Sequence, residues 1–351
     1  MSGQNPPIDL TPAREAGIDH ADYRVVVPSK HTTRAYVTAR EFLVELSRVT
    51  GSATTALDRL PMHVLSKAIK RTGVLQRLGP MRSAWRQGRY DVVFVPEDQL
   101  GFFPPMGLRR RVVPWCMDSW PKFDAGLHAF FKKFGVQRAC FTQRAAAARC
   151  QEALPDIDAC WMPESTPPGL YDAATPLADR SIRLISYGRQ LDGVNEAMAA
   201  LGDATSGVFD ATACRQRFAD MTDLRRALGQ TRATIAYPRS TTDPTFSGGS
   251  ETMTLRYLEA VASGTVLLGQ APREMIDLFG FDPVVPATPD TLRSVVQDLD
   301  DRPERYQAHA DRCHARFLQV GTSAVRARQF ADWLRTGAVP FSQGSSRTLA
   351  A

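Results

Sequence analysis

Short apolar runs alternate with amphipathic segments along the chain. The β-branched run at Tyr23–Pro28 is typical of a strand, and residues 33–49 carry apolar side chains at helical spacing. The strand pattern returns in four later runs, at 90–96, 112–117, 136–141 and 157–162, with helical patterns at 125–134 and 143–154 between the last three. Alternation of this kind predicts an α/β fold with a parallel sheet between two layers of helices.

A turn-rich segment at Pro163–Pro176 then interrupts the alternation, and its prolines disfavour both helix and strand. The pattern restarts behind it with strands at 182–187, 233–237 and 265–269 and helices at 195–201 and 251–262. Three more helical patterns follow, at 291–299, 303–320 and 323–336. We therefore predict two doubly wound, Rossmann-like domains joined by one linker, with ligands bound between the carboxyl ends of their strands.

Composition supports two soluble domains. The chain has 351 residues, of which 43% are hydrophobic and 23% charged, as in globular proteins. It offers neither a secretory pattern at its first residues nor an apolar stretch long enough to span a bilayer. Its six cysteines form no C-x-x-C pair, which favours a reducing cytosol and predicts no metal site.

The charge distribution is uneven. The formal net charge is +6, and the basic excess lies before residue 170. Between Asp58 and Asp91 there is no acidic residue, and the basic residues of Arg59–Arg89 are interleaved with apolar ones. This stretch is either a solvated face or a surface that docks on anionic lipid, at the inner face of the membrane, or on a phosphorylated acceptor. Nucleic acid is an unlikely partner because no recognition motif accompanies the charge.

The segment from Tyr237 to Gly269 carries the most specific chemistry. A strand ends in a loop that contains Gly248, Gly249 and Ser250, and the pattern predicts a helix from Glu251. Unpaired amides and the positive end of a helix dipole at such a start would bind a diphosphate. Glycines allow phosphates to approach the backbone, and Ser250 is a candidate N-cap.

Two carboxylates, Glu251 and Glu259, stand eight residues apart on this predicted helix. That spacing corresponds to about 12 Å along the axis with about 80° of rotation. One small group could not contact both side chains, but an extended ligand could. A nucleotide-sugar has the required length, with its sugar and diphosphate at the helix start and its ribose two turns further on.

The spacing Glu251-x7-Glu259, followed by Ala260–Thr265, resembles the E-x7-E signature of retaining GT-B glycosyltransferases, the glycosyl transferases group one. The resemblance implies that Glu251 lies beside the donor sugar and that Glu259 binds the ribose. It also implies that the amides of Thr252 and Met253 hold the diphosphate.

A second similarity lies at Ile185–Gly193, where the family has a strand that ends in Gly-Arg. The resemblance gives Gly188 and Arg189 the role of binding the donor phosphates, for which a planar guanidinium is suited. Asp192 and Gly193 stand where the family usually has a lysine, and Arg239 is a candidate substitute.

In the first half, a strand ending at Met117-Asp118 occupies the place of the family's strand that ends in His-Asp. Met117 replaces the histidine, and Asp118 is the candidate for a retained catalytic role.

The resemblance implies a GT-B fold, in which two Rossmann-like domains face each other across a cleft. The expected parts are an acceptor-binding domain at 1–165, a nucleotide-sugar-binding domain at 166–322, a helix at 323–337 that returns to the first domain, and a polar tail at 338–351. The implied activity is transfer of a hexose from a UDP- or GDP-linked donor to an unidentified acceptor, with retention and without a bound metal or cofactor. Such an enzyme would build a polysaccharide or glycoconjugate in the cytoplasm.

Two alternatives remain. The missing lysine and histidine are also consistent with a catalytically silent GT-B-like protein that binds a nucleotide-sugar or regulates a partner. A Rossmann oxidoreductase is disfavoured, because no G-x-G-x-x-G follows the strand at Tyr23 or the strand at Ile182.

Overall fold

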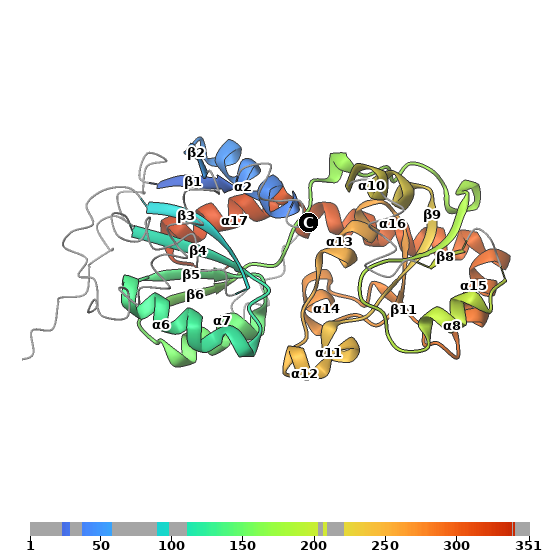
Figure 1. Ribbon diagram of the computed structural model, residues 1–351. Helices are drawn as coiled ribbons and strands as arrows, with labels where there is room; N and C mark the ends of the chain where they lie inside the picture. The colour runs from blue at the N-terminus through green and yellow to red at the C-terminus, as the bar shows by residue number, and fades with distance from the viewer. Residues whose placement is uncertain are drawn as a thin grey trace, which may run out of the picture.

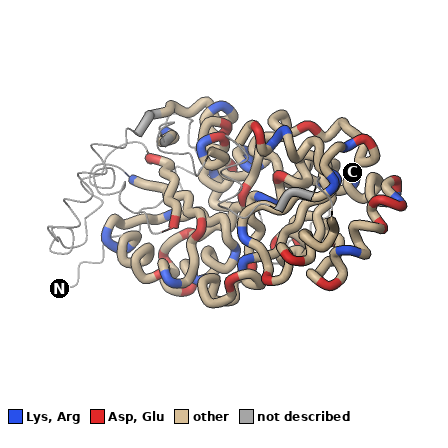
Figure 2. Tube along the Cα trace, turned by 45° about the vertical axis from the view of Figure 1, so that its right-hand side comes forward, with Lys and Arg blue, Asp and Glu red and all other residues tan. Residues whose placement is uncertain are grey.

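The computed structural model describes residues 23–28, 37–57, 90–97, 111–202, 206–208, 221–338 and 340. Figure 1 shows two α/β domains side by side, with the final helix, in red, lying in the domain that contains the N-terminal strands. Acidic and basic positions are interspersed along both domains in Figure 2. None of the described helices combines the length and the apolar character needed to cross a bilayer.

The first sheet has six strands in the order β2-β1-β3-β4-β5-β6, all parallel. Its inner strands are almost continuously apolar because both faces are covered by helices. The strands are β1 (Tyr23–Pro28), β2 (Ala53–Leu57), β3 (Tyr90–Pro96), β4 (Arg111–Met117), β5 (Arg138–Phe141) and β6 (Asp158–Trp161).

Successive side chains of these strands point to opposite faces of the sheet, where they belong to two different apolar clusters. Val25 belongs to a cluster with helices α2 (Val37–Thr50) and α17 (Ser323–Thr336). Val26 belongs to a cluster on the other face, with α6 (Asp124–Phe134) and α7 (Arg144–Ala153). The last helix of the chain therefore completes the core of the first domain.

The second sheet repeats this design with five parallel strands in the order β11-β10-β9-β7-β8. The strands are β7 (Ile182–Ser186), β8 (Ser206–Val208), β9 (Thr231–Ala236), β10 (Val266–Gly269) and β11 (Val284–Pro286). The sheet again lies between two apolar clusters, to which the neighbouring residues Leu267 and Leu268 contribute in turn.

Helices cover both faces of the second sheet (Figure 1). The regular helices are α8 (Val194–Ala199), α10 (Met221–Gly229), α13 (Leu255–Ala262), α14 (Arg273–Phe279), α15 (Leu292–Asp301) and α16 (Pro303–Val320). Two single-turn helices, α11 (Arg239–Thr242) and α12 (Pro244–Ser247), follow β9.

The chain passes between the domains twice, and the two crossings pair with each other. Thr166, between β6 and β7, forms an isolated parallel bridge with Thr322, between α16 and α17. The Thr166 amide donates to the Gly321 carbonyl at 3.3 Å, and the Ser323 amide donates to the Thr166 carbonyl at 3.2 Å. The two chain crossings therefore lie side by side.

These sheets confirm the predicted fold class of two doubly wound domains. The pattern also predicted helices at 303–320 and 323–336, and α16 and α17 have these bounds. It did not predict β2, β8, β11, α10 and α14, which are short or weakly periodic elements. The predicted helix start at Glu251 is wrong, because α13 begins at Leu255.

Candidate nucleotide-sugar site

Two arginines follow the strands at the switch point of the second sheet. β7 and β9 are neighbours in the sheet, while β8 lies on one side of the pair and β10 on the other. Arg189 comes shortly after β7, and Arg239 is the first residue of α11, after β9. Ligands of open α/β sheets bind outside the carboxyl ends of the strands where the order reverses.

A third guanidinium, that of Arg256 on α13, joins this pair. Its Nη1 donates to the Arg189 carbonyl at 3.0 Å. Gly188 has φ +77°, and any Cβ at this position would overlap the Arg256 guanidinium. Burial lowers the pKa of Arg189, and the positive charges of Arg239 and Arg256 lower it further. We call these three residues the arginine cluster.

The first domain faces this cluster with Asp118, the residue after β4. Its φ is +56°, a left-handed conformation that aspartate tolerates better than most residues. Burial raises the pKa of its carboxyl group, and the charges of Arg189 and Arg239 act in the opposite direction. Asp118 is therefore close enough to both arginines to interact with them across the domain boundary.

Aromatic contacts also join the domains at Arg239. The Arg239 guanidinium lies 3.4 Å from the centre of the Phe246 ring, and the Nζ of Lys122, from the first domain, lies 3.3 Å from the same centre. Two cationic groups this close to one ring centre would overlap on the same face, so they lie on opposite faces of Phe246. Trp120 packs edge-on against Phe246, at 6.0 Å between ring centres.

The predicted glycine-rich loop also lies at the boundary. Gly248 and Gly249 have φ +59° and +72°. A Cβ on Gly248 would lie 2.9 Å from Cγ of Pro121 in the first domain, which is closer than real Cβ contacts. The Ser250 hydroxyl accepts a hydrogen bond from Arg149 Nη1 of the first domain at 3.3 Å.

Residues 251–254, after this loop, are not helical, which corrects the predicted helix start. Glu251 Oε2 accepts the amide of Arg273, at the start of α14, at 2.8 Å. Thr254, rather than Ser250, occupies the N-cap position of α13, and its backbone is extended. Glu251 and Glu259 are therefore not on one helix, and the separation expected for two helical residues does not apply.

Glu274, on α14, holds the same segment from the other side. Its carboxylate accepts the Met253 amide at 2.9 Å, the Thr252 hydroxyl at 3.2 Å and the Arg144 amide of the first domain at 2.7 Å. Burial raises its pKa to about 7, and these hydrogen bonds act in the opposite direction. The Met253 amide is thus occupied, so it is not free for a phosphate oxygen as the resemblance implied.

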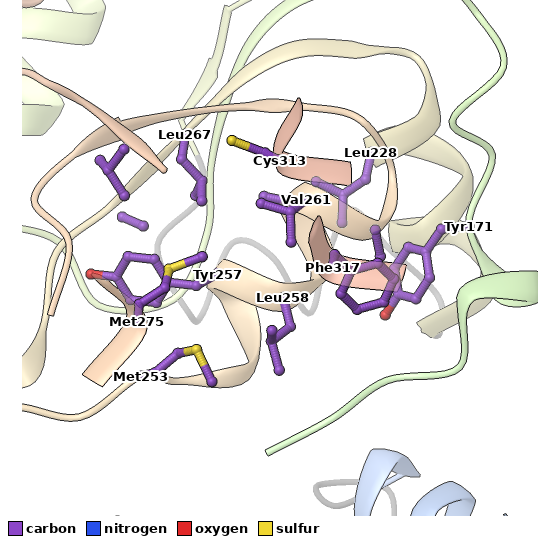
Figure 3. Packing of buried hydrophobic residues seen from close by; sticks show 14 of the residues in the cluster. Tyr171, Leu228, Met253, Tyr257, Leu258, Val261, Leu267, Met275, Cys313 and Phe317 are labelled. Atoms are coloured by element: carbon purple, nitrogen blue, oxygen red, sulfur yellow. The ribbon is translucent and has the colours of Figure 1, made fainter. Parts of the chain in front are cut away.

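Glu259 lies deep in the second domain, on the buried face of α13. It is 3% exposed, beside the apolar cluster in which Tyr257, Leu258 and Val261 pack (Figure 3). The Tyr187 hydroxyl donates to Oε2 at 3.1 Å, and the Tyr171 hydroxyl to Oε1 at 3.4 Å. Burial raises the pKa of Glu259, and the Tyr187 hydrogen bond and the Arg225 charge oppose this effect.

Three charged residues near the site were missed by the sequence analysis: Glu164, Arg256 and Glu274. Glu164 follows β6. Burial raises the pKa of the Glu164 carboxyl group well above the usual range, and the negative charges of Asp118, Glu259 and Glu274 raise it further. A hydrogen bond from the Leu255 amide acts in the opposite direction and lowers this pKa. No short motif marks these positions, although Arg256 lies between Glu251 and Glu259 in the sequence.

Two expectations fall on residues outside the described ranges: the basic stretch Arg59–Arg89 and nearly all of the tail at 338–351. Docking on anionic lipid therefore stays a prediction. Among the described residues, no three His, Cys, Asp or Glu side chains are grouped to hold a metal ion.

Part of the chain matches a model of a known protein family. Residues 181–332, which hold the second sheet and the arginine cluster, match the family model described as "Glycosyl transferase-like". No curated protein sequence matches the chain significantly.

Solved structures share the architecture over almost the full length. Anabaena Alr3699/HepE, solved in complex with UDP and glucose, is similar with a TM-score of 0.57 and 9% identity over 89% of this chain and 99% of that chain. Sucrose-phosphate synthase (tll1590) from Thermosynechococcus elongatus gives 0.55 and 11% identity over 89% and 98%. AviGT4, a glycosyltransferase involved in avilamycin A biosynthesis, gives 0.52 and 13% identity over 90% and 99%. The protein has the GT-B fold.

Proposed function

We propose that the protein is a glycosyltransferase that moves a hexose from a nucleoside-diphosphate sugar to an acceptor held by the first domain, with retention of configuration. The observation that carries this proposal is the arginine cluster at the switch point of the second sheet. The family match of residues 181–332 and the GT-B fold support it. Among the similar structures, Alr3699/HepE was also solved with UDP-glucose.

Repulsion among the three guanidinium groups favours a diphosphate. Burial and the charges of Arg239 and Arg256 lower the pKa of Arg189, while the carboxylates of Asp118, Asp243 and Glu259 also interact with the cluster, and the Arg239–Asp243 ion pair measures 3.1 Å. The Arg239 side chain is only 12% exposed, so its charge is less screened than that of a surface group. A diphosphate would relieve this repulsion. The same guanidinium groups would stabilise the charge that develops on the diphosphate as it leaves the sugar.

The remaining roles follow from position. The sugar would lie between the cluster and Asp118, a first-domain carboxylate that interacts with the charges of Arg189 and Arg239. Glu251 would border the sugar from the second domain, and Glu259 would accept hydrogen bonds from the ribose. Thr252 and the loop at Gly248–Ser250 would border the diphosphate, with the arginines in place of the Met253 amide as its main contacts.

The test is release of nucleoside diphosphate from UDP-glucose, GDP-mannose and ADP-glucose, with and without a panel of saccharide and lipid-linked acceptors. We expect acceptor-dependent release with at least one donor. Turnover should fall about 100-fold in Arg189→Ala and in Glu251→Ala, as expected for loss of one preorganised contact to the transition state.

Arg335→Ala is the matched control, because Arg335 is 55% exposed and forms its ion pair within α17, with Asp332. Donor binding without acceptor-dependent release would favour a catalytically silent protein. Transfer at the wild-type rate by both site variants would refute the proposed roles.

A further inference from the structure

Glu259 has unused hydrogen-bonding capacity. Each of its oxygens accepts one tyrosine hydroxyl, from Tyr171 on Oε1 and from Tyr187 on Oε2. An ionised carboxylate offers about four acceptor positions, so roughly one remains on each oxygen. The two tyrosines thus fix the plane of the carboxylate while leaving it able to accept two further hydroxyl groups.

Tyr171 is itself held by the segment that joins the domains. Its hydroxyl accepts a hydrogen bond from Thr166 Oγ1 at 3.1 Å, and Thr166 is the residue that pairs with Thr322 at the domain crossing. The same hydroxyl accepts from Arg225 Nε, on α10, at 3.4 Å, and the Arg225 guanidinium lies 5.3 Å from the centre of the Tyr171 ring. The position of Tyr171 therefore depends on both contacts.

Arg225 reaches from the second domain to the first. Its Nη1 and Nη2 donate to the two oxygens of Glu41, on α2, at 2.9 and 2.7 Å. The side chains of Arg225 and Glu41 are only 9% and 19% exposed, so this two-pronged pair is less screened than a surface ion pair. Helix α2 in turn packs against α17 and the first sheet.

These contacts form one continuous chain from the first domain to the carboxylate: Glu41, Arg225, Tyr171, Glu259. We infer that this chain is a positioning relay, through which the seating of the first domain on the second sets the orientation of Glu259 for the ribose of the donor. Arg225, Tyr171 and Glu41 are positioning residues, because none of them needs to touch the nucleotide. The inference rests on the proposed function, since it gives Glu259 a ribose to recognise.

The relay makes ribose recognition sensitive to a residue in the other domain. Glu41→Gln keeps the size of the side chain but removes its charge, so it weakens the interaction with the Arg225 guanidinium group. Tyr171→Phe removes the hydroxyl that orients Oε1 of Glu259 and preserves the ring in its apolar cluster. Both changes should act on the ribose contact and leave the arginine cluster in place.

The experiment measures dissociation constants of UDP, GDP and ADP and of their 2′-deoxy and 3′-deoxy forms. The wild type should bind the ribonucleotide about 10-fold more tightly than the deoxy forms, because one good hydrogen bond to a charged group contributes about this much affinity. In Glu41→Gln and Tyr171→Phe this ratio should fall to about 2-fold, whereas a purely structural loss would weaken ribo- and deoxynucleotide alike and leave the ratio unchanged.

Arg226→Gln is the control. Arg226 is the next residue on α10, is 71% exposed, and pairs with Asp223 on the same helix. The ratio of deoxynucleotide to ribonucleotide dissociation constants in Arg226→Gln should therefore equal that of the wild type. A wild type that binds none of the nucleotides would overturn the proposed function and the relay with it. A wild type that discriminates, together with relay variants of unchanged ratio, would overturn the relay alone.

Discussion

Buried carboxyl groups dominate the electrostatics of the domain boundary. Asp118, Glu164, Glu259 and Glu274 all have pKa values raised by burial, and all lie near the proposed donor site. Perturbed pKa values cluster at functional sites because the same burial that excludes water also disfavours charge. The residue for which a pH effect can be worked out most directly is Glu274.

The protein should lose stability as the pH rises through the range in which Glu274 ionises. Its pKa is about 7 in the folded chain against an ordinary value of 4.5, so between pH 5 and 7 the folded state keeps a proton that the unfolded state loses. The free energy of unfolding should fall across this window by about 2 kcal/mol from this residue.

Urea denaturation of wild type and Glu274→Gln at pH 5, 6 and 7 checks this expectation. The variant cannot ionise, so its unfolding free energy should depend less on pH, while the exposed Glu152→Gln control should follow the wild type. Equal pH dependence in wild type and Glu274→Gln would mean that this carboxyl group does not titrate in the window.

At the scale of elements, the sequence predicted best where a helix is defined by its own residues. α17 begins after Thr322, whose hydroxyl accepts the Val325 amide at 3.3 Å, and ends at Gly337, whose φ of +70° suits glycine. These signals are local, so the pattern gave both ends of the helix.

The start of α13 could not be predicted in this way, because tertiary contacts set it. Glu251 caps α14, and Glu274 binds the Met253 amide, so both hold residues 251–254 out of the helix. Glu251 and Glu259 have the E-x7-E spacing in the sequence, but the prediction that both lie on one helix was wrong, because α13 begins at Leu255.

α17 makes a second prediction at this scale. Trp333 is fully buried between α2 and the first sheet, and Arg138 donates to its carbonyl at 3.1 Å. Trp333→Ala should lower the free energy of unfolding by about 3–5 kcal/mol, as for other large core truncations. Leu318→Ala, at a residue 45% exposed on α16, should change it by less than about 0.5 kcal/mol. Similar losses in both variants would show that α17 does not complete the first core.

At the scale of the whole molecule, the sequence predicted two α/β domains and a site between them, since alternating strands and helices imply parallel sheets with functional carboxyl ends. It also predicted Arg189 and Arg239 as donor-binding residues, and the structure brings these two side chains close enough for their charges to interact. It could not predict which side chains cross the boundary. The contacts of Glu41 with Arg225, of Lys122 with Phe246 and of Arg144 with Glu274 depend on how the domains are seated, and no local pattern encodes this.

The central claim is that the arginine cluster binds the diphosphate of a nucleotide. Titration calorimetry of the wild type with UDP, GDP and ADP, each compared with its parent nucleoside, tests it most directly. We predict that at least one diphosphate binds more tightly than its nucleoside, and that Arg239→Ala weakens the diphosphate about 10-fold or more and the nucleoside little. Failure of every diphosphate to bind, or equal diphosphate affinity in wild type and Arg239→Ala, would contradict the account.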